Sequence, residues 1–224
     1  MGRSLAALAP ALAVACALAG APALAHDGHD HGATRVAYPT TGAEVTPPSR
    51  DRSPESRGGA FSLTDHTGRA VTDETYRGSW RLMFFGYVGC REACPTGLDT
   101  VAAALDGLGA RGDAVVPLFV DVSMEEPDLL GLATFVENFH PRIVGLTGER
   151  AQTFAVVRAF RVRREYAMTN YSEKETGPRL NHTTWIYLVD PDGATRDLID
   201  PTTPPAEVAA IVMAHMDAYA EATR

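Results

Sequence analysis

The chain has 224 residues, a formal net charge of -8, 45% hydrophobic residues and 21% charged residues. This composition excludes a disordered tail, a collagen-like fibre and a protein with many membrane spans. The acidic balance argues against a nucleic-acid binding protein, which would carry a basic patch, and 3 cysteines are too few for a disulfide-stapled scaffold. The length suits one domain with an additional segment.

Residues 1–25 have the layout of a secretory signal peptide. Arg3 precedes an apolar run over residues 5–19, and the segment ends in Ala23-Leu24-Ala25, which is an A-x-A cleavage pattern. The apolar run is shorter than the roughly 20 residues that a spanning helix needs, and an uncleaved N-terminal anchor is the alternative. We therefore expect a periplasmic protein, either free or anchored to the inner membrane by its N-terminal segment.

Residues 26–59 are expected to form a His-rich flexible tether. The stretch is rich in Pro, Gly, Ser and Thr, shows almost no apolar periodicity, and carries His26, His29 and His31 near its start. Short His-rich tracts bind Cu²⁺ or Zn²⁺, so weak metal capture is one interpretation and a solvated linker is the other. The globular domain is predicted over residues 60–224.

Turn signals and apolar periodicity predict the elements of this domain. Residues 65–68 form a turn signal, which favours a hairpin between residues 60–63 and 70–71. The other predicted elements are strands at 80–88, 115–122, 143–146, 184–189 and 194–199, and helices at 96–108, 128–139, 150–160 and 205–222. This order predicts an α/β sandwich, in which helices flank a central mixed sheet that begins with the N-terminal hairpin.

Cys90 and Cys94 form a CxxxC motif between the strand at 80–88 and the helix at 96–108. They are the only cysteines left once the signal segment, which contains Cys16, is removed. The positive end of a helix dipole favours thiolate, and the i, i+4 spacing puts both sulfurs on one side of a first helical turn. Two adjacent thiolates suit Cu⁺. The alternatives are inert buried thiols, a structural disulfide, or a redox pair one residue longer than CxxC.

With this motif, four stretches of the chain resemble the SCO/SenC family of copper chaperones and cytochrome oxidase assembly factors. They are FFGYVGCREACPT at residues 84–96, FVDV at 119–122, PRIVGLTG at 141–148 and HTTWIYLVDPDG at 182–193. The resemblance implies a thioredoxin-like fold and a copper ion, Cu⁺ or Cu²⁺, bound by Cys90, Cys94 and His182. Taken by itself, His182 would be interpreted as a surface or capping residue.

The resemblance also implies a metallochaperone rather than an enzyme. Its acceptor would be the binuclear copper site of oxidase subunit II or another copper acceptor. Its further partners would be a periplasmic copper donor and a thiol reductant. No nucleic acid is expected as a partner. The alternative is an extracytoplasmic thiol–disulfide oxidoreductase, in which Cys90 and Cys94 reduce the acceptor's cysteines or act in redox signalling. A metal buffer based on the His-rich tether is a third hypothesis. His182 separates the first two, because a dithiol reductase needs no distal imidazole.

The chain departs from the family pattern in three places. Residues 91–93 read Arg-Glu-Ala where the family usually has Pro-Asp-Val, Asn181 stands where Asp usually precedes the ligand histidine, and Ser123 stands where the family has the Asp of Val-Asp-Pro. Groups beside a ligand orient it and tune the metal, so these changes bear on copper affinity and redox balance. Asp121, two positions before Ser123, is a candidate replacement for the lost acidic group.

Three other histidines are not expected to bind a metal. His66 lies in the predicted hairpin turn and is expected to be solvated, and His140 is expected to cap a helix end. His215 lies close in sequence to Met213 and Met216. These three could form a second soft metal site, but ordinary packing and exposure around a helix is the preferred interpretation.

Overall fold

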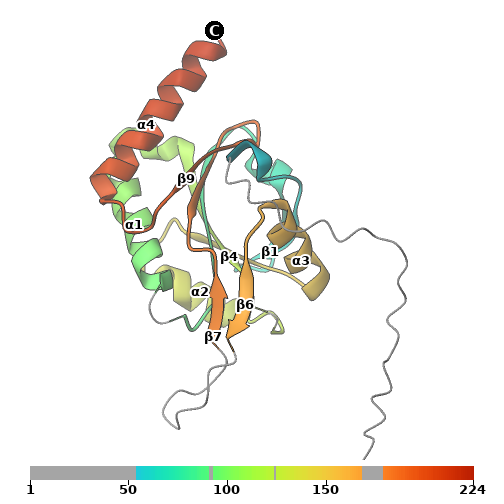
Figure 1. The fold of residues 1–224 in the computed structure, drawn as a ribbon. Coiled ribbons are helices and arrows are strands. Elements are labelled where there is room, and N and C mark those ends of the chain that lie inside the picture. Colours follow the sequence, from blue (N-terminus) through green and yellow to red (C-terminus); the bar gives the residue numbers. More distant parts are fainter. Residues whose placement is uncertain (1–53, 91–92, 124, 168–178) are drawn as a thin grey trace, which may run out of the picture. The chain divides into compact units, whose positions relative to one another are not determined.

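The computed structural model describes residues 54–90, 93–123, 125–167 and 179–224 (Figure 1). The predicted signal peptide and most of the predicted tether, including its three histidines, lie outside these ranges. Within these ranges, no helix combines the length and the apolar character that a bilayer crossing requires.

A mixed sheet of seven strands forms the centre of the domain, in the order β2-β1-β5-β4-β3-β8-β9. The pairs β3–β4 and β4–β5 are parallel and the other pairs are antiparallel. The strands are β1 (Ser62–Asp65), β2 (Ala70–Thr72), β3 (Trp80–Gly86), β4 (Val115–Asp121), β5 (Val144–Thr147), β8 (Ile186–Val189) and β9 (Thr195–Ile199). Because the central parallel strands are covered on both faces, they consist of nearly continuous apolar runs.

Helices cover both faces of this sheet. They are α1 (Ala93–Gly107), α2 (Leu129–Glu137), α3 (Arg150–Ala159) and α4 (Pro205–Ala222), with short 3₁₀ helices η1 (Pro54–Ser56), η2 (Asp73–Tyr76) and η3 (Gly109–Ala114). Successive side chains of β3 alternate between two cores: Leu82 and Phe84 pack with α1, α2 and α4, whereas Met83 and Phe85 pack with α3. Figure 1 shows α4 beside α1 on the first of these faces.

The predicted α/β sandwich and its elements are confirmed, with ends that differ by a few residues. Helix α1 begins at Ala93, ahead of the predicted start at residue 96, so Cys94 belongs to the helix. We did not predict a second, two-stranded sheet, which β6 (Arg164–Ala167) and β7 (Arg179–His182) form as an antiparallel pair (Figure 1). These short strands carry charged residues and show no apolar alternation, so periodicity does not reveal them.

The described chain that leads into β1 lies against the domain. The N–H of Gly58 donates to the carbonyl of Ala159 at 2.9 Å, and Arg57 Nη1 donates to the carbonyl of Phe160 at 3.3 Å. These bonds attach part of the expected tether segment to the end of α3.

Candidate metal centre

Cys90 and Cys94 lie where β3 ends and α1 begins. The N–H of Cys90 donates to the carbonyl of Tyr87 at 3.1 Å, which turns the chain after the strand. The N–H of Cys94 donates to Cys90 Sγ at 3.3 Å. The first N–H groups of a helix have no carbonyl partner within it, so this bond satisfies one of them and favours negative charge on the sulfur. Both cysteines are free thiols in the structure.

Gly86, the last residue of β3, provides the space for the sulfur of Cys94. A Cβ atom at Gly86 would lie 2.6 Å from Cys94 Sγ and 2.8 Å from the ring of Phe119. Both distances are shorter than a van der Waals contact, so the sulfur can lie against the strand only where a side chain is missing. Cys94 is fully buried as a result, whereas Cys90 keeps 9% of its surface exposed.

His182 brings an imidazole to these sulfurs from a distant part of the chain. The residue ends β7, and its Nε2 lies 3.7 Å from Cys94 Sγ. One nitrogen or sulfur atom from each of Cys90, Cys94 and His182 lies within 4.8 Å of the other two. The fold thus brings together the three residues predicted as ligands, and no other such group of His, Cys, Asp or Glu occurs in the part of the chain that the structure describes.

A hydrogen bond determines which nitrogen of His182 is available to a metal. Nδ1 lies 2.9 Å from the carbonyl oxygen of Thr183. Because a carbonyl oxygen only accepts, Nδ1 carries the proton of the neutral ring, and Nε2, the nitrogen beside Cys94, keeps its lone pair. This is the usual arrangement of a ligand histidine, whose second nitrogen is oriented by a hydrogen bond.

Two aromatic rings hold the imidazole in this orientation. The ring of Tyr87 is 5.9 Å from that of His182 with an interplanar angle of 84°, and the ring of Phe84 is 6.5 Å away at 79°. Edge-to-face contacts of this kind restrict rotation of the imidazole. Phe84 and Tyr87 belong to the segment that leads to Cys90, so one stretch of chain positions both the sulfurs and the ring.

The β6–β7 hairpin is attached to the rest of the domain through Arg164, which sequence reasoning missed. Arg164 is the partner of His182 in the strand register, and its Nη1 donates to the carbonyl of Val122 at 2.8 Å. Its guanidinium also lies 4.6 Å from the centre of the Phe154 ring in α3. No sequence signal could have found Arg164, because its role depends on a strand pairing without an apolar pattern.

The electrostatics of the site favour a neutral thiol at Cys94 in the metal-free protein. The hydrogen bond with Cys90, and then burial, raise the pKa of the Cys94 thiol. Burial also raises the pKa of the Asp121 carboxyl, although the Ser123 N–H donates to its Oδ1 at 2.8 Å. Asp121 is close enough for its charge to contribute to the raised pKa of Cys94, which puts an acidic group near the sulfurs. Arg91, Glu92 and the side chain of Asn181 lie outside the described residues.

The histidines with other predicted roles form hydrogen bonds elsewhere in the fold. His66 is half-buried, and its Nδ1 accepts from the N–H of Gly145 at 3.0 Å, so His66 joins the hairpin turn to β5. His215 Nε2 lies 3.2 Å from Asp197 Oδ2, while the two nearby methionines pack against the core. His140 Nε2 lies 3.4 Å from a carboxylate of α1.

A central mixed sheet flanked by helices, with one cysteine just before the helix that follows β3 and the other in its first turn, defines a thioredoxin-like protein. The adjacent imidazole adds a candidate metal site to it. The chain belongs to the SCO1/SenC family, whose sequence model matches residues 49–217.

Curated proteins of known name are similar to this chain in sequence. The human protein SCO1 homolog, mitochondrial, is 34% identical over 164 residues, which cover 72% of this chain and 54% of that protein. Protein sco1 of Schizosaccharomyces pombe is 37% identical over 139 residues, which cover 61% of this chain and 52% of that protein. The chain therefore spans about half the length of the curated relatives it matches.

Solved structures confirm the predicted thioredoxin-like fold. Bradyrhizobium japonicum ScoI with copper bound is 33% identical with a TM-score of 0.63, and the match covers 70% of this chain and 98% of that chain. Yeast Sco1 with copper bound is 26% identical with a TM-score of 0.64, and the match covers 72% of this chain and 89% of that chain.

Proposed function

We propose that this protein is a copper metallochaperone that acts in the assembly of a respiratory oxidase. The observation that carries the proposal is the grouping of Cys90, Cys94 and His182, whose potential ligand atoms lie within 4.8 Å of one another. Two thiolates and one imidazole suit Cu⁺ in a three-coordinate site and Cu²⁺ with a further ligand. The copper-bound states of the similar ScoI and yeast Sco1 structures support this choice of metal.

Copper is cargo in this proposal, so the site must both hold and release it. Cys94 is fully buried, Cys90 keeps 9% of its surface exposed, and His182 belongs to a hairpin outside the main sheet. An acceptor thiolate therefore attacks the ion from the side of Cys90, and Cys94 is the last ligand to leave. The two thiols lose their protons when copper binds and recover protons when it leaves.

The partners follow from this ligand exchange. An acceptor needs soft ligands of its own, and the binuclear copper site of oxidase subunit II is the acceptor that the family resemblance implies. The other two partners are a periplasmic copper donor and a thiol reductant. The reductant is needed because Cys90 and Cys94 must be reduced to accept copper. Residues 1–25 as an export signal or retained anchor, and residues 26–59 as a tether before the domain of residues 60–224, fit this extracytoplasmic role.

Copper titration of reduced residues 49–224, a range that leaves out the tether histidines, tests the proposal. We expect the wild-type domain to bind one copper ion. His182→Ala should lower the affinity at least about tenfold, and Cys90→Ala and Cys94→Ala more, since each removes a ligand. His140→Ala is the matched control, because His140 pairs with Asp106 about three turns along α1 from Cys94. Equal affinity in the wild-type and His182→Ala domains would contradict the proposal.

A thiol–disulfide oxidoreductase is the second candidate, and the unequal exposure of the two cysteines favours it. Cys90, the less buried of the two, can attack an acceptor disulfide, and the adjacent, fully buried Cys94 can then resolve the mixed disulfide. In this function two electrons pass from the dithiol to the acceptor, and the imidazole is not needed. We therefore expect a reductase to keep its rate of acceptor reduction in His182→Ala, and that result together with unchanged copper affinity would favour this function over copper delivery.

A further inference from the structure

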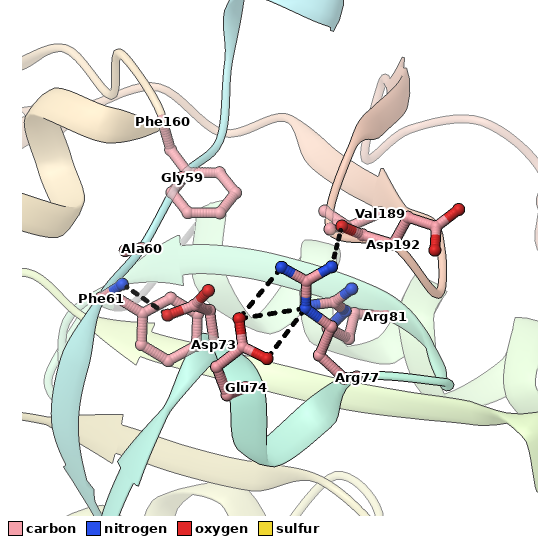
Figure 2. Close-up of a pocket in the computed structure, with 11 residues that line it drawn as sticks. Gly59, Ala60, Phe61, Asp73, Glu74, Arg77, Arg81, Phe160, Val189 and Asp192 are labelled. Carbon is pink, nitrogen blue, oxygen red and sulfur yellow. Dashed lines mark hydrogen bonds and ion pairs between the residues drawn. The ribbon is translucent and has the colours of Figure 1, made fainter.

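A cavity of about 320 Å³ lies at the end of β3 remote from the cysteines. It is bounded by the chain before β1, by η2, by the turn between β8 and β9, and by the end of α3, and Figure 2 shows the side chains that line it. Arg81 lies near the start of β3, whereas Gly86 beside the cysteines ends it, and the five steps along the strand from Arg81 to Gly86 span about 16 Å. The cavity is therefore separate from the candidate metal centre.

Arg81 is a buried cation in the wall of this cavity. Only 2% of the residue is exposed, and its Nη2 donates to the backbone carbonyl of Asp190. Its Nε is buried without a hydrogen-bond partner, and within the described ranges no carboxylate forms an ion pair with it. Burying a guanidinium without a counter-ion is unfavourable, and burial lowers the pKa of Arg81 accordingly.

The carboxylates around Arg81 are engaged with other donors. Each of these carboxylates has a donor of its own: Arg77 for Glu74, Arg196 for Asp190, the Tyr219 hydroxyl for Asp192 and the Phe61 N–H for Asp73. Figure 2 shows that the guanidinium of Arg77 donates to the carboxylate of Glu74 and to the backbone carbonyl of Asp192. The protein therefore supplies acidic groups near Arg81 but leaves its charge without a direct ion pair.

We propose that this cavity binds a small carboxylate ligand, whose oxygens pair with the guanidinium of Arg81. A carboxylate presents two acceptors, which match the planar donors of an arginine. Asp73 and Asp192, which also line the cavity, would repel a purely anionic ligand but accept hydrogen bonds from an ammonium group. The ligand class is therefore an amphoteric carboxylate such as an α-amino acid, with its apolar part against Phe61 and Phe160.

The test uses the full-length, copper-free protein, so its outcome is independent of the proposed copper function. The Nε–H signal of Arg81 in the NMR spectrum is followed during titration with glycine, acetate and methylammonium. We expect saturable shifts of this signal with glycine, weaker binding of acetate, and no shift with methylammonium. Binding of acetate as strong as that of glycine would overturn the amphoteric ligand class. Absence of any shift with glycine and acetate would overturn the site.

Variants provide the second arm of the test. Arg81→Met should lower the affinity for glycine about tenfold or more, because the charge-assisted hydrogen bonds are lost. Arg69→Met is the matched control, since Arg69 pairs with Asp65 outside the cavity, and it should bind glycine like the wild type. Equal affinity in Arg81→Met and the wild type would contradict the proposal. If Arg81→Met does not fold, the Arg81 signal of the wild-type protein still decides the question.

Discussion

Arg164 and His182 are direct partners across the β6–β7 hairpin, and each makes a separate contact with the rest of the domain. Arg164 donates to the carbonyl of Val122 just after β4, whereas His182 Nε2 lies 3.7 Å from Cys94 Sγ. The hairpin is not part of the main sheet, so contacts such as the one from Arg164 hold it in place. The position of the imidazole therefore depends on a residue that is not itself a potential ligand.

Arg164→Met should weaken copper binding without unfolding the protein. Losing the bond to Val122 and the contact with Phe154 leaves His182 on a less constrained hairpin, and we expect copper affinity to fall about tenfold. Competition titration measures the affinity, and urea denaturation checks that the domain stays folded. Arg111→Met, which removes a surface pair with Asp217, is the control. Unchanged copper affinity in Arg164→Met would show that the hairpin does not need this anchor.

Gly86→Ala should destabilise the domain and disturb the site. The added methyl group would lie 2.6 Å from Cys94 Sγ, so either the sulfur or the strand must move. Overpacking of this kind costs about 1–3 kcal/mol, and copper affinity should fall as well. In the control Gly107→Ala, the nearest side-chain atom is 3.6 Å away, so no destabilisation is expected. Urea denaturation of both variants compares the free energies of unfolding, and equal values would contradict this account of Gly86.

Copper affinity of the reduced protein should rise with pH. The pKa of Cys94 is raised by its hydrogen bond with Cys90 and by burial, so the metal-free thiol keeps its proton at neutral pH. Copper must displace that proton, and a lower proton concentration favours the bound state. Competition titrations across about pH 6 to 8 at constant ionic strength measure this dependence. An affinity that is constant with pH would show that both sulfurs are already thiolates before copper arrives.

Asp65 should stabilise the domain in an acid-sensitive way. Burial raises the pKa of this carboxyl, but hydrogen bonds from Thr67 and Arg69 outweigh it and lower the pKa from 3.8 to about 2. A lowered pKa in the folded state stabilises the fold above the unfolded value, and this contribution is lost as pH falls from 3.8 toward about 2. We expect Asp65→Asn to lose about 1–2 kcal/mol at neutral pH. Urea denaturation of the wild type and of Asp65→Asn at neutral and acidic pH tests this. The difference between their free energies of unfolding should become smaller at acidic pH.

Local sequence pattern by itself determined most of the fold. The apolar run of β3 and the helical spacing in α1 predict their elements because each of them buries its own apolar face. The CxxxC spacing likewise predicts two neighbouring sulfurs, since residues four apart lie on one side of a helix. Recognising His182 as a ligand required a resemblance to known proteins, because a single histidine carries no local pattern.

Only the tertiary structure decided how the imidazole meets the sulfurs. His182 and Cys94 are 88 positions apart in the chain, and their approach depends on a hairpin whose polar strands show no periodicity. The protonation of Nδ1 depends on the Thr183 carbonyl, and the burial of Arg81 beside a cavity depends on segments that pack together from distant parts of the sequence. Such contacts arise from the packing of the whole chain, so no short stretch of residues specifies them.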